Sequence, residues 1–313
     1  MINFRYPSVI EKQKISAFRV EPAGISSRDV RGVVQIAHGM SEYARRYLPF
    51  AQFLADNGFV VVANDHLGHG KTAGESINYG YFGMLRTENL LVEDMRTLHE
   101  LTRELYPDTP YFMLGHSMGS FLLREYLTIY GDELSGAIIM GTGDPSSTLA
   151  SFGFGLARLT EALRGEKYRS PMLRKLVMGK YNNRIKRAQS DFDWLSTDPA
   201  VVAAYNDDKA TGFTFTTNGY EHMFANLVFA TSDKAIAEIP KDMPILVISG
   251  AEDPVGGYGD QVRSFTKRLE KAGVQDVTMV LYPGMRHEVL NEHDKQQVYE
   301  EILRWLEERD SAK

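Results

Sequence analysis

The amino-acid sequence predicts an α/β fold, in which a mostly parallel, doubly wound sheet carries helices on both faces. Two observations favour this class. Short runs rich in Val, Ile and Met alternate with longer segments whose apolar residues recur every three or four positions. The short runs are nearly continuous in apolar character, which is typical of strands buried on both faces of a parallel sheet. Regular alternation of such strands with helices predicts the doubly wound arrangement.

Six runs have the composition of buried strands. They are Val33–Ala37, Phe59–Ala63, Tyr111–Leu114, Ala137–Met140, Ile245–Ser249 and Val277–Leu281. Apolar stripes at helical spacing predict helices near residues 47–54, 91–105 and 298–306. Asn57 and Gly58 follow the first of these stripes and provide a left-handed stop.

The alternation is interrupted in the middle of the chain, where no strand pattern is evident. We therefore expect a core made of residues 1–143 and 239–313, with residues 144–238 inserted as a helical cap. One cap helix carries an apolar stripe, which we expect to pack against the core, since amphipathic helices usually do. The alternatives are a pocket wall for an acyl chain or a weak membrane-facing lip. The stripe consists of Leu149, Phe152, Leu156, Leu159 and Leu163.

Composition limits the possible classes of function. The chain has 313 residues and a net charge of −6, which argues against a protein held on nucleic acid or on an anionic membrane by electrostatics. Without cysteine it has no disulfide and no thiolate metal site, and its histidines lack the spacing of a metal motif. No apolar run is long enough to cross a membrane, and the first residues lack the pattern of a signal peptide. A cytoplasmic protein, monomeric or weakly oligomeric, is expected.

The pentapeptide Gly115-His116-Ser117-Met118-Gly119 is the most informative motif. A predicted strand leads into it and a helical pattern leads out, which is the context of a nucleophile elbow. In such an elbow a strained turn projects the serine Oγ from the sheet edge. The two glycines are expected because a Cβ at either position would clash where strand and helix cross. Ser117 is therefore predicted to be a nucleophile.

A serine nucleophile needs a base, and the base needs a carboxylate that orients it. Both groups are expected in loops at the carboxyl ends of later strands. Asp253 follows the fifth predicted strand and His287 follows the sixth, so we predict Asp253 as the acid and His287 as the base. Asp144, which follows the fourth predicted strand, is the alternative acid. Glu252 is less suitable because consecutive side chains diverge.

The remaining polar groups of the site follow from the same chemistry. Attack on a carbonyl creates an oxyanion that backbone N–H groups stabilise. The amide of Met118, after the nucleophile, and that of Met40, in the loop after the first predicted strand, are the candidate donors. Of the other histidines, His99 is expected to be solvated in mid-helix, whereas His66 and His69 are expected to make structural hydrogen bonds.

Taken together, the motifs resemble the monoacylglycerol lipase and lysophospholipase-like group of α/β-hydrolases, which is also grouped with the serine aminopeptidases. The resemblance is carried by the stretch HGMSEYARRY at residues 38–47, which matches the pattern HG-x-x-E-x-x-x-RY, and by DHLGHG at residues 65–70, in addition to GHSMG. It implies an α/β-hydrolase fold with an inserted helical cap, the triad and oxyanion hole named above, and no cofactor.

Two residues are carried over from the resemblance alone. Glu42 and Arg46 match positions that lie beside the polar head of the substrate in monoacylglycerol lipases. The alternative for this pair is a surface salt bridge near a helix start. The chain departs from the vertebrate enzymes at Leu290, where they have a second histidine, and in its lack of cysteines.

The resulting hypothesis is a serine carboxylester hydrolase that acts on monoacylglycerol-like or lysophospholipid-like esters. A small-molecule or lipid ester substrate, no nucleic acid and at most transient membrane-surface contact are expected. Two alternatives remain open: a ligand-binding protein with a residual hydrolase site, and a serine aminopeptidase, which needs an acidic cap residue for the substrate's α-amine. The acidic candidates are Glu161, Glu166, Asp191, Asp193, Asp207 and Asp208.

Overall fold

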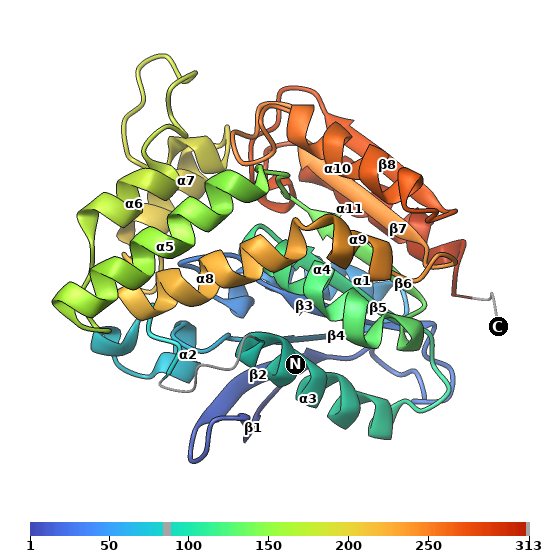
Figure 1. Ribbon diagram of the computed structural model, residues 1–313. Coiled ribbons are helices and arrows are strands. Elements are labelled where there is room, and N and C mark those ends of the chain that lie inside the picture. Colours follow the sequence, from blue (N-terminus) through green and yellow to red (C-terminus); the bar gives the residue numbers. More distant parts are fainter. Residues whose placement is uncertain (84–88, 311–313) are drawn as a thin grey trace.

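A single sheet of eight strands forms the centre of the computed structural model, which describes residues 1–83 and 89–310 (Figure 1). Residues 84–88 and 311–313, which the predicted core ranges include, lie outside the described residues. The strands are β1 (Ile2–Pro7), β2 (Lys14–Val20), β3 (Gly32–Ala37), β4 (Phe59–Asn64), β5 (Tyr111–His116), β6 (Gly136–Met140), β7 (Ile245–Gly250) and β8 (Val277–Tyr282).

The strand order is β1-β2-β4-β3-β5-β6-β7-β8. The β1–β2 and β2–β4 pairs are antiparallel, and the other neighbours are parallel. All six predicted strands are present, as β3 to β8. The two N-terminal strands are missing from the sequence prediction because they lack a continuous apolar run: β1 is largely exposed at the sheet edge, and β2 alternates between buried and half-buried residues. The opposite edge strand, β8, is half-buried rather than buried.

Helices cover both faces of this sheet, as the sequence predicts. Side chains of α1 and α11 share one hydrophobic cluster with the sheet, and side chains of α3, α4 and α10 share a second cluster on the opposite face. Five short 3-10 turns complete the described elements: η1 (Ala44–Tyr47), η2 (Ser76–Asn78), η3 (Gly131–Glu133), η4 (Asp193–Leu195) and η5 (Val289–Asn291). The helices are α1 (Leu48–Asp56), α2 (Gly70–Ala73), α3 (Leu90–Leu105), α4 (Met118–Tyr130), α5 (Ser147–Arg164), α6 (Pro171–Met178), α7 (Pro199–Asp207), α8 (Thr217–Ala230), α9 (Asp233–Glu238), α10 (Asp260–Lys271) and α11 (Lys295–Glu307).

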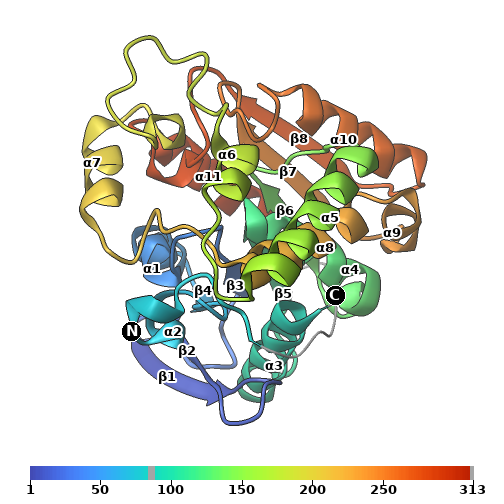
Figure 2. The ribbon, with the colours of Figure 1, turned by 60° about the vertical axis from the view of Figure 1, so that its left-hand side comes forward.

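Between β6 and β7 the chain forms helices α5 to α9 and the turn η4, without a strand. The helix starts follow from local sequence, since Ser146, Ser170 and Thr216 each accept a hydrogen bond from a backbone N–H in the first turn of α5, α6 and α8. Figures 1 and 2 both show α5 and α8 side by side, and α8 also packs on α4. We propose that this segment is the predicted cap.

One buried side chain holds both the start of the helical segment and the end of α8. Arg124 of α4 donates to the carbonyl oxygen of Gly143, where the segment leaves the sheet, and to that of Ala230, at the end of α8. The distances are 2.9 and 2.7 Å. Asp144 lies 3.9 Å from the same guanidinium and is paired more closely with Arg268 of α10. Helices α5 to α8 therefore depart from and return to the same part of α4.

The expectation that the apolar stripe of α5 packs against the core is wrong for four of its five residues. Leu149, Phe152, Leu159 and Leu163 are exposed, whereas Leu156 is half-buried and packs against the core. The opposite face of the helix, which carries the small residues Ala150, Gly153 and Ala157, is the buried one. A Cβ on Gly153 would lie 2.4 Å from the ring of Phe224 in α8, so the two helices approach too closely for larger side chains. Close packing of small residues therefore turns the large ones outward.

Candidate active site

Ser117 occupies the turn between β5 and α4. Its φ of 53° and ψ of −118° form a strained conformation that is rare outside glycine. A Cβ on Gly115 would lie 2.3 Å from the carbonyl oxygen of Gly119, and one on Gly119 would lie 2.1 Å from that of Ala37. The strand–turn–helix geometry expected from the pentapeptide is therefore present, and it directs Ser117 into a cavity.

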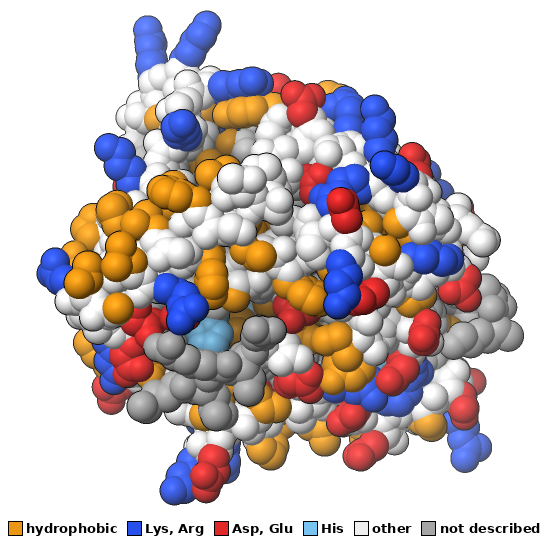
Figure 3. All heavy atoms as spheres, in the orientation of Figure 1, with side chains coloured by type: hydrophobic (Ala, Val, Ile, Leu, Met, Phe, Trp, Pro, Cys, Tyr) orange, Lys and Arg blue, Asp and Glu red, His pale blue; other side chains and the backbone are white. Residues whose placement is uncertain are grey.

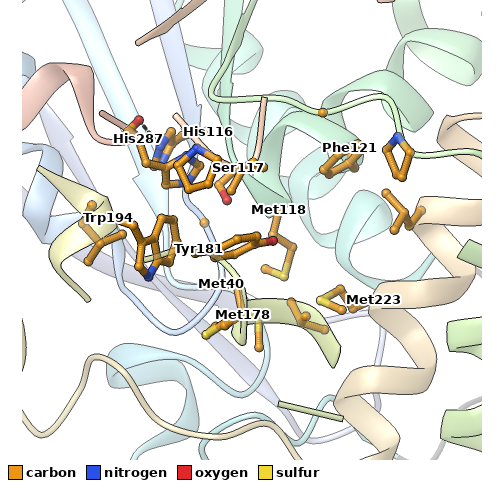
Figure 4. Close-up of a pocket in the computed structure, with 18 of the residues that line it drawn as sticks. Met40, His116, Ser117, Met118, Phe121, Met178, Tyr181, Trp194, Met223 and His287 are labelled. Carbon is orange, nitrogen blue, oxygen red and sulfur yellow. Dashed lines mark hydrogen bonds between the residues drawn. The ribbon is translucent and has the colours of Figure 1, made fainter. Parts of the chain in front are cut away.

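The two predicted oxyanion donors line the same cavity as Ser117 (Figure 4). Met118 begins α4, so its amide is one of those that a helix leaves without an intrahelical partner. Met40 lies in the loop after β3. That loop is fixed by the N–H of Gly39, which donates to Glu42 Oε1 at 2.6 Å. The positions suit the predicted role, and donation to a substrate oxygen stays a prediction.

A hydrogen bond joins Asp253 and His287, with 2.9 Å between Oδ2 and Nδ1. The buried carboxylate also accepts from the Ser249 hydroxyl at 3.0 Å and the Val255 amide at 2.8 Å. Burial alone would raise the pKa of Asp253, but the imidazole of His287 and these donors hold it below its usual value. An ionised carboxylate at Nδ1 favours a proton on that nitrogen, which leaves Nε2 as a proton acceptor.

The alternative acids lie elsewhere. Asp144 is held by Arg268 at 2.5 Å and by the Ser264 hydroxyl at 2.8 Å. Glu252 is exposed next to the buried Asp253, as expected for consecutive side chains that diverge. The geometry thus favours Asp253 as the partner of His287.

Four further histidines, His38, His66, His69 and His99, are buried, whereas His293 is exposed. His99 is not solvated, contrary to the expectation: it is buried with Nδ1 2.6 Å from the Tyr126 hydroxyl, because α3 turns this side toward α4. His69 accepts from the Ser41 amide through Nε2 at 3.3 Å, and its ring packs near those of His38 and His66. Burial lowers the pKa of all three histidines in this cluster.

Arg46 joins two buried carboxylates. Its guanidinium is 2.7 Å from Glu42 and makes a two-point contact with Glu288 at 2.6 and 2.7 Å. At most 13% of any of these three side chains is exposed, so the group is not a surface salt bridge. Burial would raise the pKa of Glu42, but the hydrogen bond with His116 and the charge of Arg46 hold it well below its usual range. Glu42 and Glu288 line the cavity, in keeping with a position near the substrate.

His116 connects this carboxylate group to the predicted base. Its Nδ1 lies 2.7 Å from the Tyr47 hydroxyl and 3.2 Å from Glu42, while its Nε2 lies 3.3 Å from the carbonyl oxygen of His287. The rings of His116 and His287 are 4.6 Å apart. Burial opposes protonation of His116, but Glu42 raises its pKa overall. A contiguous buried network therefore runs from the loop after β3 to His287.

The cavity itself has a volume of about 390 Å³. Figure 4 shows Ser117, His116 and His287 grouped on its wall, with Trp194 and Tyr181 next to them. This side also carries the two carboxylates. The other side is apolar and comes from α4, α5, α6 and α8, through residues that include Phe121, Leu149, Leu176, Met178, Met223 and Leu227. The cavity is therefore polar near the serine and apolar beyond it.

A family model described as "Serine aminopeptidase, S33" matches residues 28–294, which span most of the sheet and the whole helical segment. The chain belongs to the S33 family. The α/β-hydrolase fold and the resemblance to the monoglyceride lipase-like group, both expected from the sequence, are confirmed, as is the class of ester-cleaving hydrolase.

Relatives of this S33 protein include enzymes of named activity. It is 31% identical to a monoacylglycerol lipase of Mycolicibacterium smegmatis over 89% of each chain. Among solved structures, it is similar to a thermostable carboxyl esterase from Bacillus coagulans in complex with glycerol, with a TM-score of 0.91, 33% identity and coverage of 99% of this chain and 98% of that one. It is also similar to a lipase in an open form, with a TM-score of 0.88, 28% identity and 99% coverage of both chains.

Several residues at this S33 site are absent from the sequence prediction. Trp194 packs its ring 4.9 Å from that of His287, and its carbonyl oxygen accepts from the backbone N–H of His287 at 3.5 Å. Tyr205 donates its hydroxyl to the carbonyl oxygen of Ser41. The only available signals are that Trp194 is one of two tryptophans and that Glu288 directly follows His287.

Proposed function

We propose that this protein is a serine carboxylester hydrolase that cleaves monoacylglycerol-like or lysophospholipid-like esters. The observation that carries the proposal is the Asp253–His287 hydrogen bond at the wall of the cavity that Ser117 shares. A cavity of about 390 Å³ lies in the size range of small-ligand sites. The activities named for the relatives, monoacylglycerol lipase and carboxyl esterase, support the same substrate class.

The reaction follows from the roles assigned to these groups. Ser117 Oγ attacks the ester carbonyl carbon while His287 Nε2 takes its proton. The carbonyl electron pair moves onto oxygen, and the amides of Met40 and Met118 stabilise this oxyanion by about 3 kcal/mol each. The tetrahedral intermediate then breaks its bond to the alcohol, which leaves with the proton from His287. Water that loses a proton to His287 attacks the acyl-enzyme, releases the fatty acid and restores Ser117.

The two sides of the cavity orient the substrate in this proposal. The acyl chain lies against the apolar wall of α4, α5 and α8, where its burial is favourable. The hydroxyl-bearing head lies toward the carboxylates of Glu42 and Glu288, which accept hydrogen bonds. This arrangement agrees with the position that the resemblance implies for Glu42, and it places Arg46 behind the carboxylates.

The lining of the cavity argues against an aminopeptidase. Among the described residues that form it, the acids are Glu42 and Glu288, and both are hydrogen-bonded to Arg46. The acidic cap residues suggested by the sequence do not line this cavity. A substrate ammonium group would therefore have to displace an internal guanidinium.

The decisive experiment is labelling with a fluorophosphonate probe, followed by kinetics. Wild type and the matched variant Ser120→Ala are expected to label, and Ser117→Ala is not. Ser120 lies one residue beyond the elbow, and its hydroxyl donates to the backbone carbonyl oxygen of Ser117. Labelled enzyme should hydrolyse monoglycerides and p-nitrophenyl esters faster than proline p-nitroanilide. Labelling of Ser117→Ala would contradict the assignment. Faster turnover of the anilide would indicate an aminopeptidase, and ligand-dependent melting without turnover would indicate a binding protein.

Three further expectations accompany this proposal: activity toward lysophospholipids, a cytoplasmic location, and a monomeric or weakly oligomeric state. No helix in the described part of the chain has the length and hydropathy needed to cross a bilayer. A chain-length series of monoglycerides and lysophosphatidylcholines would define the substrate range, because the depth of the apolar wall sets the longest acyl chain that fits.

A further inference from the structure

A cluster of three buried histidines lies at the loop that carries Met40, residues 38–44, here called the oxyanion loop. Six of the eight histidines of the chain are buried, and little histidine is visible on the face of the molecule in Figure 3. The ring centres of His38 and His66 are 4.2 Å apart, and those of His38 and His69 are 5.0 Å apart. A buried polar ring costs free energy unless hydrogen bonds compensate it. The hydrogen bonds of this cluster therefore indicate what it does.

Side chains of the DHLGHG stretch at residues 65–70 hold the oxyanion loop. The Ser41 amide donates to His69 Nε2 at 3.3 Å, and the Ala44 amide donates to Asp65 Oδ1 at 2.9 Å. The imidazole of His69 is neutral in this role, because an amide donates only to an unprotonated ring nitrogen, and its Nδ1 donates to a backbone carbonyl oxygen at 2.9 Å. Burial lowers the pKa of His69 to about 3, which keeps Nε2 unprotonated at neutral pH.

The same stretch fixes the peptide unit that contains the Met40 N–H. The His66 amide donates to His38 Nε2 at 3.0 Å, so the proton of the neutral His38 ring is on Nδ1. This Nδ1 donates to the carbonyl oxygen of Gly39 at 2.8 Å. The oxygen and the Met40 N–H belong to one planar peptide unit and point in opposite directions. Fixing the oxygen therefore also directs the N–H.

The backbone of Ser41, next to Met40, needs external support. Its φ of 54° lies in the left-handed region, which is uncommon for residues other than glycine. The carbonyl oxygen of Ser41 accepts from the Tyr205 hydroxyl and the Gly212 amide, both at 2.9 Å. Strain of this kind persists only where the surroundings determine the conformation. Loss of the acceptor on His69 would allow Ser41 to relax, and Met40 would move with it.

We propose that His69 is a positioning residue for the oxyanion hole: its neutral imidazole holds Ser41 so that the Met40 N–H meets the substrate oxygen. This role rests on the proposed function, because the oxyanion forms only in that reaction. His69 does not line the cavity, so it acts through the oxyanion loop. Among the residues that the structure describes, none accepts from the Met40 amide, whereas the amides of Gly39 and Ser41 on either side both have acceptors. The Met40 N–H is thus held in place while its bonding capacity is kept for a ligand.

Turnover of a water-soluble p-nitrophenyl ester by two variants of His69 tests this role. His69→Leu removes the acceptor, so kcat is expected to fall by about 100-fold with little change in KM, because a displacement of about 1 Å costs that order. His69→Gln keeps an acceptor oxygen close to the position of Nε2, so its kcat is expected to stay within about ten-fold of wild type. The control is His99→Leu, which removes another buried histidine, hydrogen-bonded to Tyr126, and should destabilise the fold but leave kcat unchanged.

Ligand binding separates the oxyanion hole from the rest of the cavity. A trifluoromethyl ketone adds to Ser117 and places an oxyanion in the hole, whereas a free fatty acid binds without forming one. His69→Leu is expected to weaken binding of the ketone by the same factor as kcat/KM, and to leave binding of the fatty acid unchanged. Equal weakening of both ligands would indicate a general loss of structure and would overturn the role of His69.

Two kinetic results would also overturn it. The first is a kcat of His69→Leu equal to that of wild type, and the second is an equal loss in His69→Leu and His69→Gln. If His69→Leu does not fold, ¹⁵N NMR of histidine-labelled wild type provides an independent reading, in which His69 is expected to carry a proton on Nδ1 and none on Nε2 at pH 7. A protonated Nε2 would contradict the hydrogen bond from Ser41. Absence of ester turnover in wild type would reject the proposed function instead, and the nitrogen spectrum would still test this contact.

Discussion

Replacement of Arg46 by Met removes the cation that separates two buried carboxylates. Arg46 makes three hydrogen bonds of 2.6 to 2.7 Å to Glu42 and Glu288, and its guanidinium also stacks 4.9 Å from the ring centre of Tyr205. Breaking a buried ion pair from one side typically costs about 3–5 kcal/mol, because the remaining charge is left without a partner. Here two carboxylates are left, so we expect a loss in unfolding free energy at the upper end of that range.

The same replacement should lower kcat. Glu42 accepts the N–H of Gly39 in the loop that carries Met40, and Glu288 directly follows His287. Repulsion between the two carboxylates would displace both the oxyanion donor and the base. A shift of about 1 Å at a reacting group costs on the order of 10²-fold in rate, so kcat should fall by that order with a smaller change in KM.

Urea unfolding and kinetics on a water-soluble p-nitrophenyl ester measure the two effects. Without Arg46, burial should raise the pKa of one of the two carboxyls, so the folded variant takes up a proton and its stability deficit should shrink as the pH falls from 7 to 5. Adding Glu288→Gln to Arg46→Met should restore part of the stability, because one buried charge is removed. Unfolding free energy within about 1 kcal/mol of wild type, together with unchanged kcat, would refute the reasoning.

Three further predictions concern the elbow, the acid and the buried histidines. Asp253→Asn should lower kcat by about 10⁴-fold, as in the chymotrypsin triad. The control Asp144→Asn should leave kcat within about ten-fold of the wild-type value. Equal losses for the two variants on a p-nitrophenyl ester would contradict the choice of acid. Gly119→Ala should prevent stable folding, because the new Cβ would lie 2.1 Å from the carbonyl oxygen of Ala37. Gly155→Ala in α5 adds a Cβ into open space, so it should raise the unfolding free energy by up to about 1 kcal/mol in urea titration. Burial lowers the pKa of His69 to about 3, whereas the same histidine in the unfolded chain has a pKa near 6.5. Between these two pH values the unfolded chain binds a proton that the folded protein does not. The stability that this group contributes is therefore lost as the pH falls from about 6.5 toward 3. His69→Gln should reduce that slope by about 1.4 kcal/mol per pH unit; an unchanged slope in urea titrations at several pH values would be inconsistent with this account.

The central strands were predictable because a strand buried on both faces has a continuous apolar run, and β3 to β7 are buried at every residue. The antiparallel strands β1 and β2 give a weaker signal, since β1 is largely exposed and the polar residues Lys14, Ser16 and Arg19 interrupt the apolar pattern of β2. The α5 stripe shows a different limit. Its periodicity indicates two unlike faces, but it does not say which one packs, and the small residues opposite the stripe decide the matter.

The candidate site was predictable where motif and topology act together. Parallel strands end at one edge of the sheet, so the loops with Asp253 and His287 had to lie near the elbow of Ser117. The geometry agrees with these positions, although their catalytic roles stay predictions. The side chains that come from the helical segment, such as Trp194, carry no local pattern, because contacts between residues far apart in sequence depend on packing. Burial of Arg46 likewise follows from tertiary structure alone.

Arg124 donates hydrogen bonds to the carbonyl oxygens of Gly143 and Ala230. These bonds hold the two points close to α4 directly, rather than through the residues between them. The residues between these two points also contact the predicted machinery, since Trp194 packs on the ring of His287 and Tyr205 donates to the carbonyl oxygen of Ser41. The stretch that supplies the apolar wall of the cavity therefore also holds the predicted base and the loop after β3. Grafting a relative's helices between the two points should transfer its chain-length preference only if the contacts made by Trp194 and Tyr205 are kept.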